Sequence, residues 1–284
     1  MGDPSLDPFY SSLTYGGNPF TEAKLKVKRA ERHLGELAYA ARELPRRRNY
    51  GFVIGRIPDP RKIELIYMSQ NAMPMEFGTI VGDAVHNIWA AFDYTTGVIS
   101  CRPYGKGERS KVSFPTGKNR ERFIEARDGI PASRGQRRKP GQMEGAGPDA
   151  LRIVEELKPY GGGDDSIRAL HDVEITDKHR LLIPAASILH VDESEFFLGD
   201  KPFSINGTDF KPNQEGTNFS AVYDCGSGAD LTQFKRGDKF EASFTIVFGE
   251  GCDFFSRREI IPTLSKLCEV AKAFIQTCET VFIS

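Results

Sequence analysis

Two short stretches of this sequence hold side chains that could move protons or bind a ligand. In the first, polar residues recur at helical spacing and line one face of a helix: Asp83, His86, Asn87 and Asp93. In the second, polar residues follow the phase of the apolar residues around them: His171, Glu174, Asp177 and Lys178. Because buried carboxylates and imidazoles need partners, we expect both faces to meet in one cluster that tunes proton affinities.

Such a cluster suits one of three roles. The pairs Asp83/His86 and His171/Glu174 have the i, i+3 spacing of ligand pairs in helical bundles, and they are candidate ligands of a divalent metal. Without a metal, the candidate catalytic acids and bases are Asp83, His86, His171, Glu174, Asp177 and Lys178. The third role is structural, since a polar network between two helices can serve only to fix their packing register. The sequence indicates no other cofactor.

Hydrophobic periodicity predicts the helices and strands that must position these side chains. Apolar residues at helical spacing mark the segments 21–44, 75–100, 120–127, 148–157, 165–184 and 257–282. Strand-like patterns mark a β-hairpin, formed by 50–57 and 63–69 around a turn, and a β-rich region at 195–248. The two polar stretches therefore fall on the second and the fifth predicted helix.

This order of elements predicts an α+β fold. We expect a helical bundle that carries an inserted β-hairpin, followed by a C-terminal antiparallel sheet and a final helix. Residues 1–20 are rich in Pro, Gly and Ser and are expected to form an N-terminal arm. Residues 21–284 are expected to form a single domain with three parts: a mainly helical part at 21–190 with the hairpin at 50–69, a β-rich part at 195–248, and a C-terminal helix at 257–282.

The charge of the chain is balanced overall but not along its length. The 284 residues include 38 Lys and Arg against 39 Asp and Glu, yet residues 1–142 have a basic excess and 143–284 an acidic one. The basic segments 46–48 and 102–139 could contact the phosphates of RNA, or a partner protein. They could equally be solvated loops, and the opposite charges of the two halves would also suit a homo-oligomer.

Several protein classes are excluded by sequence features. No apolar run is long enough to span a membrane, and the N-terminus lacks the basic start and apolar core of a signal peptide. The five cysteines form no C-x-x-C pair, which is typical of reduced thiols in a cytoplasmic protein. The glycine run 161–163 is followed by two aspartates, which would repel the phosphates of a P-loop ligand. We expect a cytoplasmic protein without a membrane partner.

The two polar stretches also resemble the signatures of a widespread bacterial family of uncharacterised proteins. The segment GDAVHNIWAAFDY is similar to that family's G-D-x-x-H-N-L-R-x-A-L-D-H motif, and LHDVEITDKHRLL is similar to its second motif, which ends in D-K-H-R. The resemblance covers residues 20–190. The family's Arg and His, five residues apart, are in turn similar to the ribonuclease motif of HEPN domains. The resemblance therefore implies a HEPN-like helical bundle.

This chain departs from the motif at the two positions that would cleave RNA. Trp89 and Tyr94 stand where the family has Arg and His, and neither an indole nor a phenol can replace those groups at neutral pH. We therefore expect a non-catalytic binding or regulatory protein with an RNA or protein partner. The alternative is an enzyme that uses the Asp/His/Glu cluster. Candidate ligand-binding residues are Asn87, Trp89, Asp93, Tyr94, His179 and Arg180.

Overall fold

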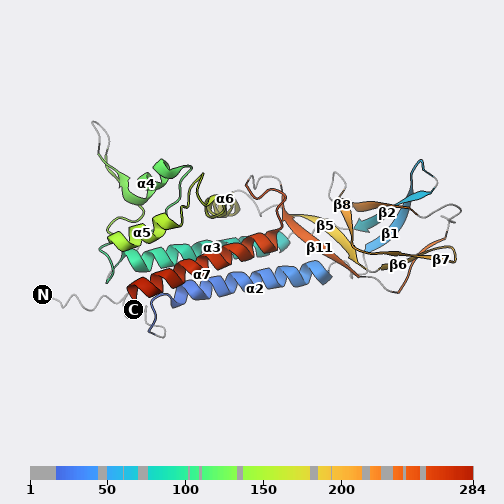
Figure 1. Cartoon of the computed structure of the whole chain (residues 1–284), viewed down its shortest axis with the longest axis horizontal. Helices are drawn as coiled ribbons and strands as arrows, with labels where there is room; N and C mark the ends of the chain where they lie inside the picture. Colours follow the sequence, from blue (N-terminus) through green and yellow to red (C-terminus); the bar gives the residue numbers. More distant parts are fainter. Residues whose placement is uncertain are drawn as a thin grey trace. The chain divides into compact units, whose positions relative to one another are not determined.

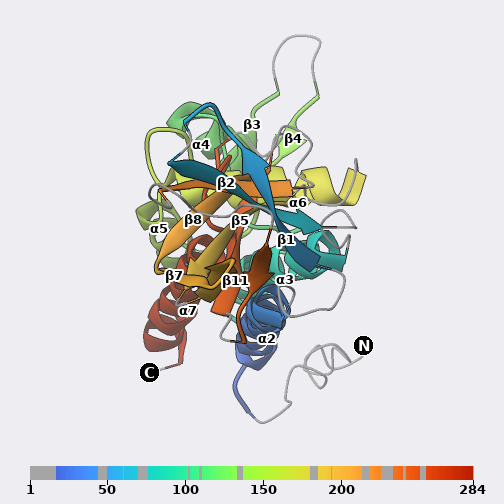
Figure 2. The same cartoon turned by 90° about the vertical axis from the view of Figure 1, so that its right-hand side faces the viewer.

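The computed structural model of the chain (Figures 1 and 2) describes residues 17–43, 50–59, 61–69, 76–101, 103–108, 111–132, 137–179, 185–192, 194–212, 218–224, 233–238, 241–249 and 254–283. These residues form six helices and eleven strands. The chain divides into two compact units, which we call the helical unit and the sheet unit. The helical unit comprises Met1–Leu34, Gly82–Leu181 and Thr263–Ser284, and the sheet unit comprises Gly35–Val81 and Leu182–Pro262.

Three long helices run side by side and contribute most of their residues to the helical unit (Figure 1): α2 (Thr21–Glu43), α3 (Glu76–Ser100) and α7 (Ile260–Phe282). Helices α2 and α7 are antiparallel, because Lys24 pairs with Glu279 and Glu31 pairs with Lys272, both at 2.5 Å. Helix α3 is apolar around most of its circumference and is largely buried, as that pattern predicts. None of the described helices, α3 included, is long and apolar enough to cross a membrane.

The helical unit also contains three shorter helices and a two-stranded sheet: α4 (Arg120–Asp128), α5 (Pro148–Glu156), α6 (Asp165–His179), β3 (Gly129–Ile130) and β4 (Lys139–Pro140). Each short helix begins at a residue suited to its first turn. The Asn119 side chain accepts a hydrogen bond from the Arg122 N–H at 2.9 Å, and a proline opens α5. Asp164 accepts one from the Ser166 N–H at 3.0 Å. The first aspartate after the glycine run therefore caps α6.

The sheet unit is built from two antiparallel sheets. The larger sheet has six strands in the order β1-β2-β9-β8-β5-β11: β1 (Tyr50–Arg56), β2 (Lys62–Ser69), β9 (Asn218–Asp224), β8 (Thr208–Pro212), β5 (Ala185–Asp192) and β11 (Glu241–Phe248). The smaller sheet has the order β10-β6-β7: β10 (Phe234–Arg236), β6 (Ser194–Leu198) and β7 (Lys201–Ile205). Figure 2 views these strands from the end of the chain's long axis.

Aromatic rings fill the core of the sheet unit. Alternate residues of β2 are buried, including Leu65 and Tyr67, as expected for a strand with one covered face. The ring of Tyr67 lies 5.0 Å from the ring centroid of Phe52 on β1 and 6.0 Å from that of Phe244 on β11. Residues far apart in the sequence thus share one core, and edge-to-face pairs of this kind stabilise it beyond the area that they bury.

The predicted HEPN-like helical bundle with an inserted hairpin and a separate C-terminal sheet is wrong. Strands β1 and β2 do pair as a hairpin, but the hairpin forms one end of the six-stranded sheet. Strand β2 pairs with β9 from Lys62↔Asp224 to Met68↔Asn218. The physical reason is that Leu65 and Tyr67 need a covered face, which a lone hairpin cannot supply. The described residues form a mixed α+β fold with three antiparallel sheets.

One boundary inside this fold also differs from the prediction. The helical pattern predicts a helix over 165–184; α6 covers Asp165–His179, and residues 180–184 lie outside the described residues. Strand β5 begins at Ala185, before the predicted β-rich region at 195–248. Strand β5 pairs along its whole length with β11, and its Leu189 and Val191 are buried. The strand depends on this pairing with a distant segment, which the local pattern does not show.

Candidate functional site

The structure brings one pair of the predicted cluster together across α3 and α6. The Nδ1 atom of His86 lies 3.4 Å from Oε1 of Glu174. The Glu174 side chain is 5% exposed and the His86 side chain is 49% exposed. A half-exposed imidazole therefore covers a buried carboxylate, which is an arrangement that can pass a proton between solvent and the interior.

Two other members of the predicted cluster make different contacts. The ring of His171 lies 4.6 Å from that of Trp89, and its Nδ1 lies 3.4 Å from the Thr116 hydroxyl oxygen. Asp93 accepts a hydrogen bond from the backbone N–H of Phe114 at 2.8 Å. Asp93 thus holds the segment around residues 114–116 against α3, and His171 contacts the same segment from α6.

The remaining α3 candidates face different surroundings. Asp83 is exposed, and its backbone carbonyl accepts a hydrogen bond from the buried Asn87 amide at 2.7 Å. The Asn87 Oδ1 atom has no hydrogen-bond partner among the described residues. Trp89 is buried toward α6, whereas Tyr94 lies under Lys26 of α2, with 5.7 Å from Nζ to the ring centroid. The two residues at the resembled Arg and His positions therefore do not share one site.

The rest of the predicted cluster lies beyond what the structure describes. Asp177, Lys178 and His179 belong to α6, but their side chains are outside the described residues, as is Arg180 altogether. Within the described ranges, no group of three or more His, Cys, Asp or Glu side chains is arranged to hold a metal ion. Metal binding by Asp83, His86, His171 and Glu174 stays a prediction.

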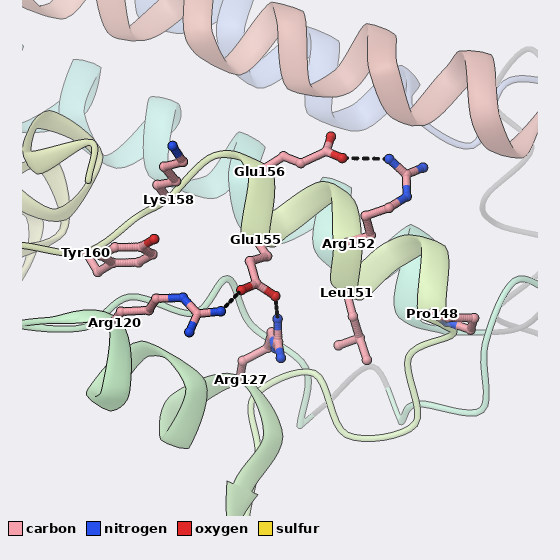
Figure 3. A pocket seen from close by; sticks show the side chains of 9 residues that line it. All are labelled: Arg120, Arg127, Pro148, Leu151, Arg152, Glu155, Glu156, Lys158 and Tyr160. Carbon is pink, nitrogen blue, oxygen red and sulfur yellow. Dashed lines mark hydrogen bonds and ion pairs between the residues drawn. The ribbon is translucent and has the colours of Figure 1, made fainter. Parts of the chain in front are cut away.

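A second cluster, which the sequence did not reveal, lies between α4 and α5 (Figure 3). It is a groove of about 580 Å³, here called the α4/α5 groove, lined by Arg120, Arg127, Pro148, Leu151, Arg152, Glu155, Glu156, Lys158 and Tyr160. Four cationic side chains and two carboxylates line it, and two further carboxylates beside it, Asp128 and Asp149, pair with Arg127 and Arg152. The lining residues come from α4, from α5 and from the segment that follows α5.

Glu155 ties the two helices of the groove together. Its Oε2 accepts a hydrogen bond from Arg127 at 2.7 Å, and its Oε1 pairs with Arg120 (Figure 3). Arg127 also donates two hydrogen bonds to the carboxylate of Asp128, at 2.7 and 2.8 Å, and the Arg127 side chain is only 11% exposed. These hydrogen bonds from Arg127 and Arg120 lower the pKa of Glu155, so the pairing is intact at neutral pH. Arg127 is therefore a structural clamp between α4 and α5.

The other three cations of the groove are accessible. The Arg120 side chain is 60% exposed, and Arg152 pairs with Glu156 at 2.7 Å in an exposed i, i+4 bridge of the kind that contributes little stability. Lys158 is exposed, and among the residues that the structure describes it has no ion-pair partner. Arg120, Arg152 and Lys158 are thus accessible to an anionic ligand, which would replace the present ion pairs of the two arginines.

The backbone around Lys158 is held in an unusual conformation. Lys158 has a φ of 49°, in the left-handed region that costs a bulky residue about 1–3 kcal/mol. Its carbonyl accepts hydrogen bonds from the N–H groups of Tyr160 and Asp164, both at 2.7 Å. Gly161 donates to the Gly117 carbonyl at 3.2 Å, which joins this turn to the segment before α4. The strain is thus maintained by neighbouring contacts at the end of the groove.

Gly161→Ala is expected to destabilise the helical unit by about 2–3 kcal/mol, measured by chemical denaturation. A Cβ at this position would lie 2.2 Å from the Lys118 carbonyl oxygen, which cannot move without breaking the backbone bridge beside it. The matched control is Gly162→Ala. Gly162 has a φ of +85° and no neighbour within 4 Å, so only the conformational cost of about 1 kcal/mol is expected. Equal losses in the two variants would contradict the close packing at Gly161.

The predicted basic segments enter the groove only in part. Arg120 and Arg127 belong to segment 102–139, but Lys111 pairs with Glu108 at 2.6 Å and Arg138 pairs with Glu144 at 2.7 Å away from the groove. The arginines of segment 46–48, and also Arg102, Arg109 and Arg134, lie outside the described residues.

Comparison of the chain with protein-family models, with curated proteins and with solved structures found no match.

Proposed function

We propose that this chain is a non-catalytic RNA-binding protein whose α4/α5 groove holds the phosphate backbone of a single strand. The observation that carries the proposal is the convergence of three exposed cations, Arg120, Arg152 and Lys158, on one groove. Guanidinium groups bind phosphate through two parallel hydrogen bonds, and an ammonium adds a point charge. Arg127 supports this surface by fixing α4 to α5 through Glu155.

Tyr160 adds an aromatic group to the same groove. Its ring packs at 5.4 Å on Phe123, which anchors it, and it lines the groove beside Arg120 (Figure 3). Single-strand binders combine cations that contact phosphates with aromatic rings that contact bases. An acidic protein segment would use the cations but would gain less from the ring. We therefore favour RNA over a partner protein.

A titration of labelled single-stranded RNA, followed by fluorescence anisotropy, tests the proposal. Phosphate contacts release counterions, so affinity is expected to fall at least about tenfold between about 50 and about 200 mM salt. An acidic peptide of equal charge serves as the competitor for the protein-partner version and is expected to bind more weakly. No affinity for RNA at about 50 mM salt would refute the proposal.

The second candidate function is an acid–base enzyme, and the His86–Glu174 pair favours it. A carboxylate that is buried beneath a solvent-accessible imidazole could serve as a proton relay. The same RNA, recovered after incubation and run on a denaturing gel, is expected to be intact. Cleavage that is lost in both His86→Ala and Glu174→Gln would replace the non-catalytic proposal with the enzymatic one.

A further inference from the structure

Strand β8 joins two halves of the described six-stranded sheet. On one side it pairs with β5 through residues 208–210, and on the other with β9 through Lys211 and Pro212. By contrast, the β2–β9 and β5–β11 pairings comprise seven and eight residue pairs. Proline has no N–H to donate to a ladder, so Pro212 contributes no donor to the β8–β9 pairing. The two seams of β8 lie in series, so loss of the β5–β8 seam alone would separate β5 and β11 from the other four strands.

His190 stands at the centre of this seam. In the register it is paired with Asp209 of β8, and its Nδ1 lies 2.6 Å from Asp209 Oδ1. Its Nε2 lies 3.1 Å from Oδ1 of Asp192, two residues along the same strand. The imidazole thus lies between two carboxylates, one across the seam and one on its own strand, and it is 34% exposed.

The charge of this imidazole decides whether both contacts are favourable. Protonated histidine donates from both ring nitrogens, whereas neutral histidine donates from one and presents a lone pair at the other. Since carboxylates only accept, neutral His190 can satisfy one aspartate and must repel the other. The hydrogen bond with Asp209 raises the pKa of His190, burial opposes it, and Asp192 adds to the increase.

The strands beside His190 add few other charges to this face. On β8, Lys211 lies two residues from Asp209. On β11, Ser243 is paired with His190 and Glu241 with Asp192, so Glu241 adds a third carboxylate. The three carboxylates face two cations, Lys211 and His190, while His190 is protonated, and only Lys211 once it is neutral, so repulsion across the β5–β8 seam increases when the proton is lost.

We propose that His190 is a protonation-dependent latch between β5 and β8, which closes the seam at low pH and loosens it at high pH. The sign follows from the raised pKa. The contribution is complete below the pKa of an unfolded histidine, about 6.5, and is lost as the pH rises through the higher pKa of the folded state. The latch acts within the sheet unit, so this inference is independent of RNA binding in the groove.

Hydrogen exchange of the intact chain, corrected for the intrinsic rate, tests the latch. Protection of the amides at 189–191 and 208–210 is expected to fall about tenfold between about pH 6 and about pH 9. Amides at 63–67, in the β1–β2 and β2–β9 pairings, are the internal reference and are expected to stay protected. A histidine NMR titration is expected to place the pKa of His190 above about 6.5.

Two aspartate variants separate the latch from a general pH effect. Asp209→Asn removes the partner across the seam and is expected to abolish the pH dependence at 208–210. Asp192→Asn leaves the hydrogen bond with Asp209, the largest cause of the raised pKa of His190, in place and is expected to reduce the pH dependence without abolishing it. A pH-independent seam in the wild-type chain, or an equal loss of the effect in both variants, would overturn the proposal. So would a pKa of His190 at or below about 6.5 in the NMR titration, which needs no variant.

Discussion

The double variant R120E/K158E is expected to bind single-stranded RNA about 100-fold more weakly than the wild-type chain at about 50 mM salt. Arg120 and Lys158 are exposed cations that line the α4/α5 groove. Reversing both charges removes two phosphate contacts and adds repulsion. The slope of log affinity against log salt is expected to become shallower by about 1.4, since each phosphate contact on a single strand contributes about 0.7.

The control for this variant is K201E/K235E, which changes the net charge by the same amount. Lys201 and Lys235 are exposed on β7 and β10, in the sheet unit. This control is expected to bind RNA within about threefold of the wild-type chain, because neither lysine lines the α4/α5 groove and neither would contact a phosphate held there. Equal losses in the two double variants would mean that the chain attracts RNA only through its overall charge. The groove would then have no special role.

Phe114→Ala is expected to destabilise the helical unit by about 3–5 kcal/mol. The Phe114 ring is fully buried, and its centroid lies 4.9 Å from Phe92, 5.7 Å from Trp89 and 5.8 Å from Phe274. Truncation leaves a cavity that rings on three sides cannot fill. Trp89 is the single tryptophan of the chain, so its fluorescence reports directly on this cluster during urea denaturation.

Phe254→Ala provides the matched control for this truncation. It deletes the same ring at a position that is 39% exposed in the sheet unit, where about 1 kcal/mol of destabilisation is expected. It is also expected to leave the emission of Trp89 in the folded chain unchanged. A loss below about 1 kcal/mol for Phe114→Ala would contradict the central place of its ring in the helical unit.

The long helices could be predicted because their periodicity is strong and local. The predicted segment 75–100 corresponds to α3 at Glu76–Ser100, and 21–44 corresponds to α2 at Thr21–Glu43. The helical spacing of the polar residues on α3 also predicted that His86 lies close to Glu174 on α6. Spacing alone could not show that Asp93 turns to the Phe114 backbone, because that acceptor role depends on a loop from elsewhere in the chain.

The sheet could not be predicted because its pairings are not local. Leu65 of β2 pairs with Ala221 of β9, and the sequence of neither strand identifies the other as its pairing partner. The aromatic rings of Phe52, Tyr67 and Phe244 became one core only after these strands paired. A hairpin signal is visible in the sequence, but the sheet that completes the hairpin is not.

The α4/α5 groove was missed for a similar reason. Arg120 and Arg127 were visible as basic residues on a short helix, but Glu155 and Tyr160 come from a later segment. The left-handed Lys158 depends on hydrogen bonds from Tyr160 and Asp164. The sequence did contain one signal, the run of three glycines that follows Tyr160, because glycine lets two backbone segments approach closely. Gly161 makes such an approach to the carbonyl of Lys118.

Hydrogen exchange with and without single-stranded RNA, at about 50 mM salt, tests RNA binding by the groove most directly. RNA is expected to slow exchange in α4, in α5 and at residues 157–160, while the strands of the sheet unit exchange as before. The R120E/K158E variant is expected to lose this protection under the same conditions. RNA-dependent protection that is confined to the sheet unit, or an unchanged α4/α5 groove at a concentration of RNA that saturates the chain, would contradict the account.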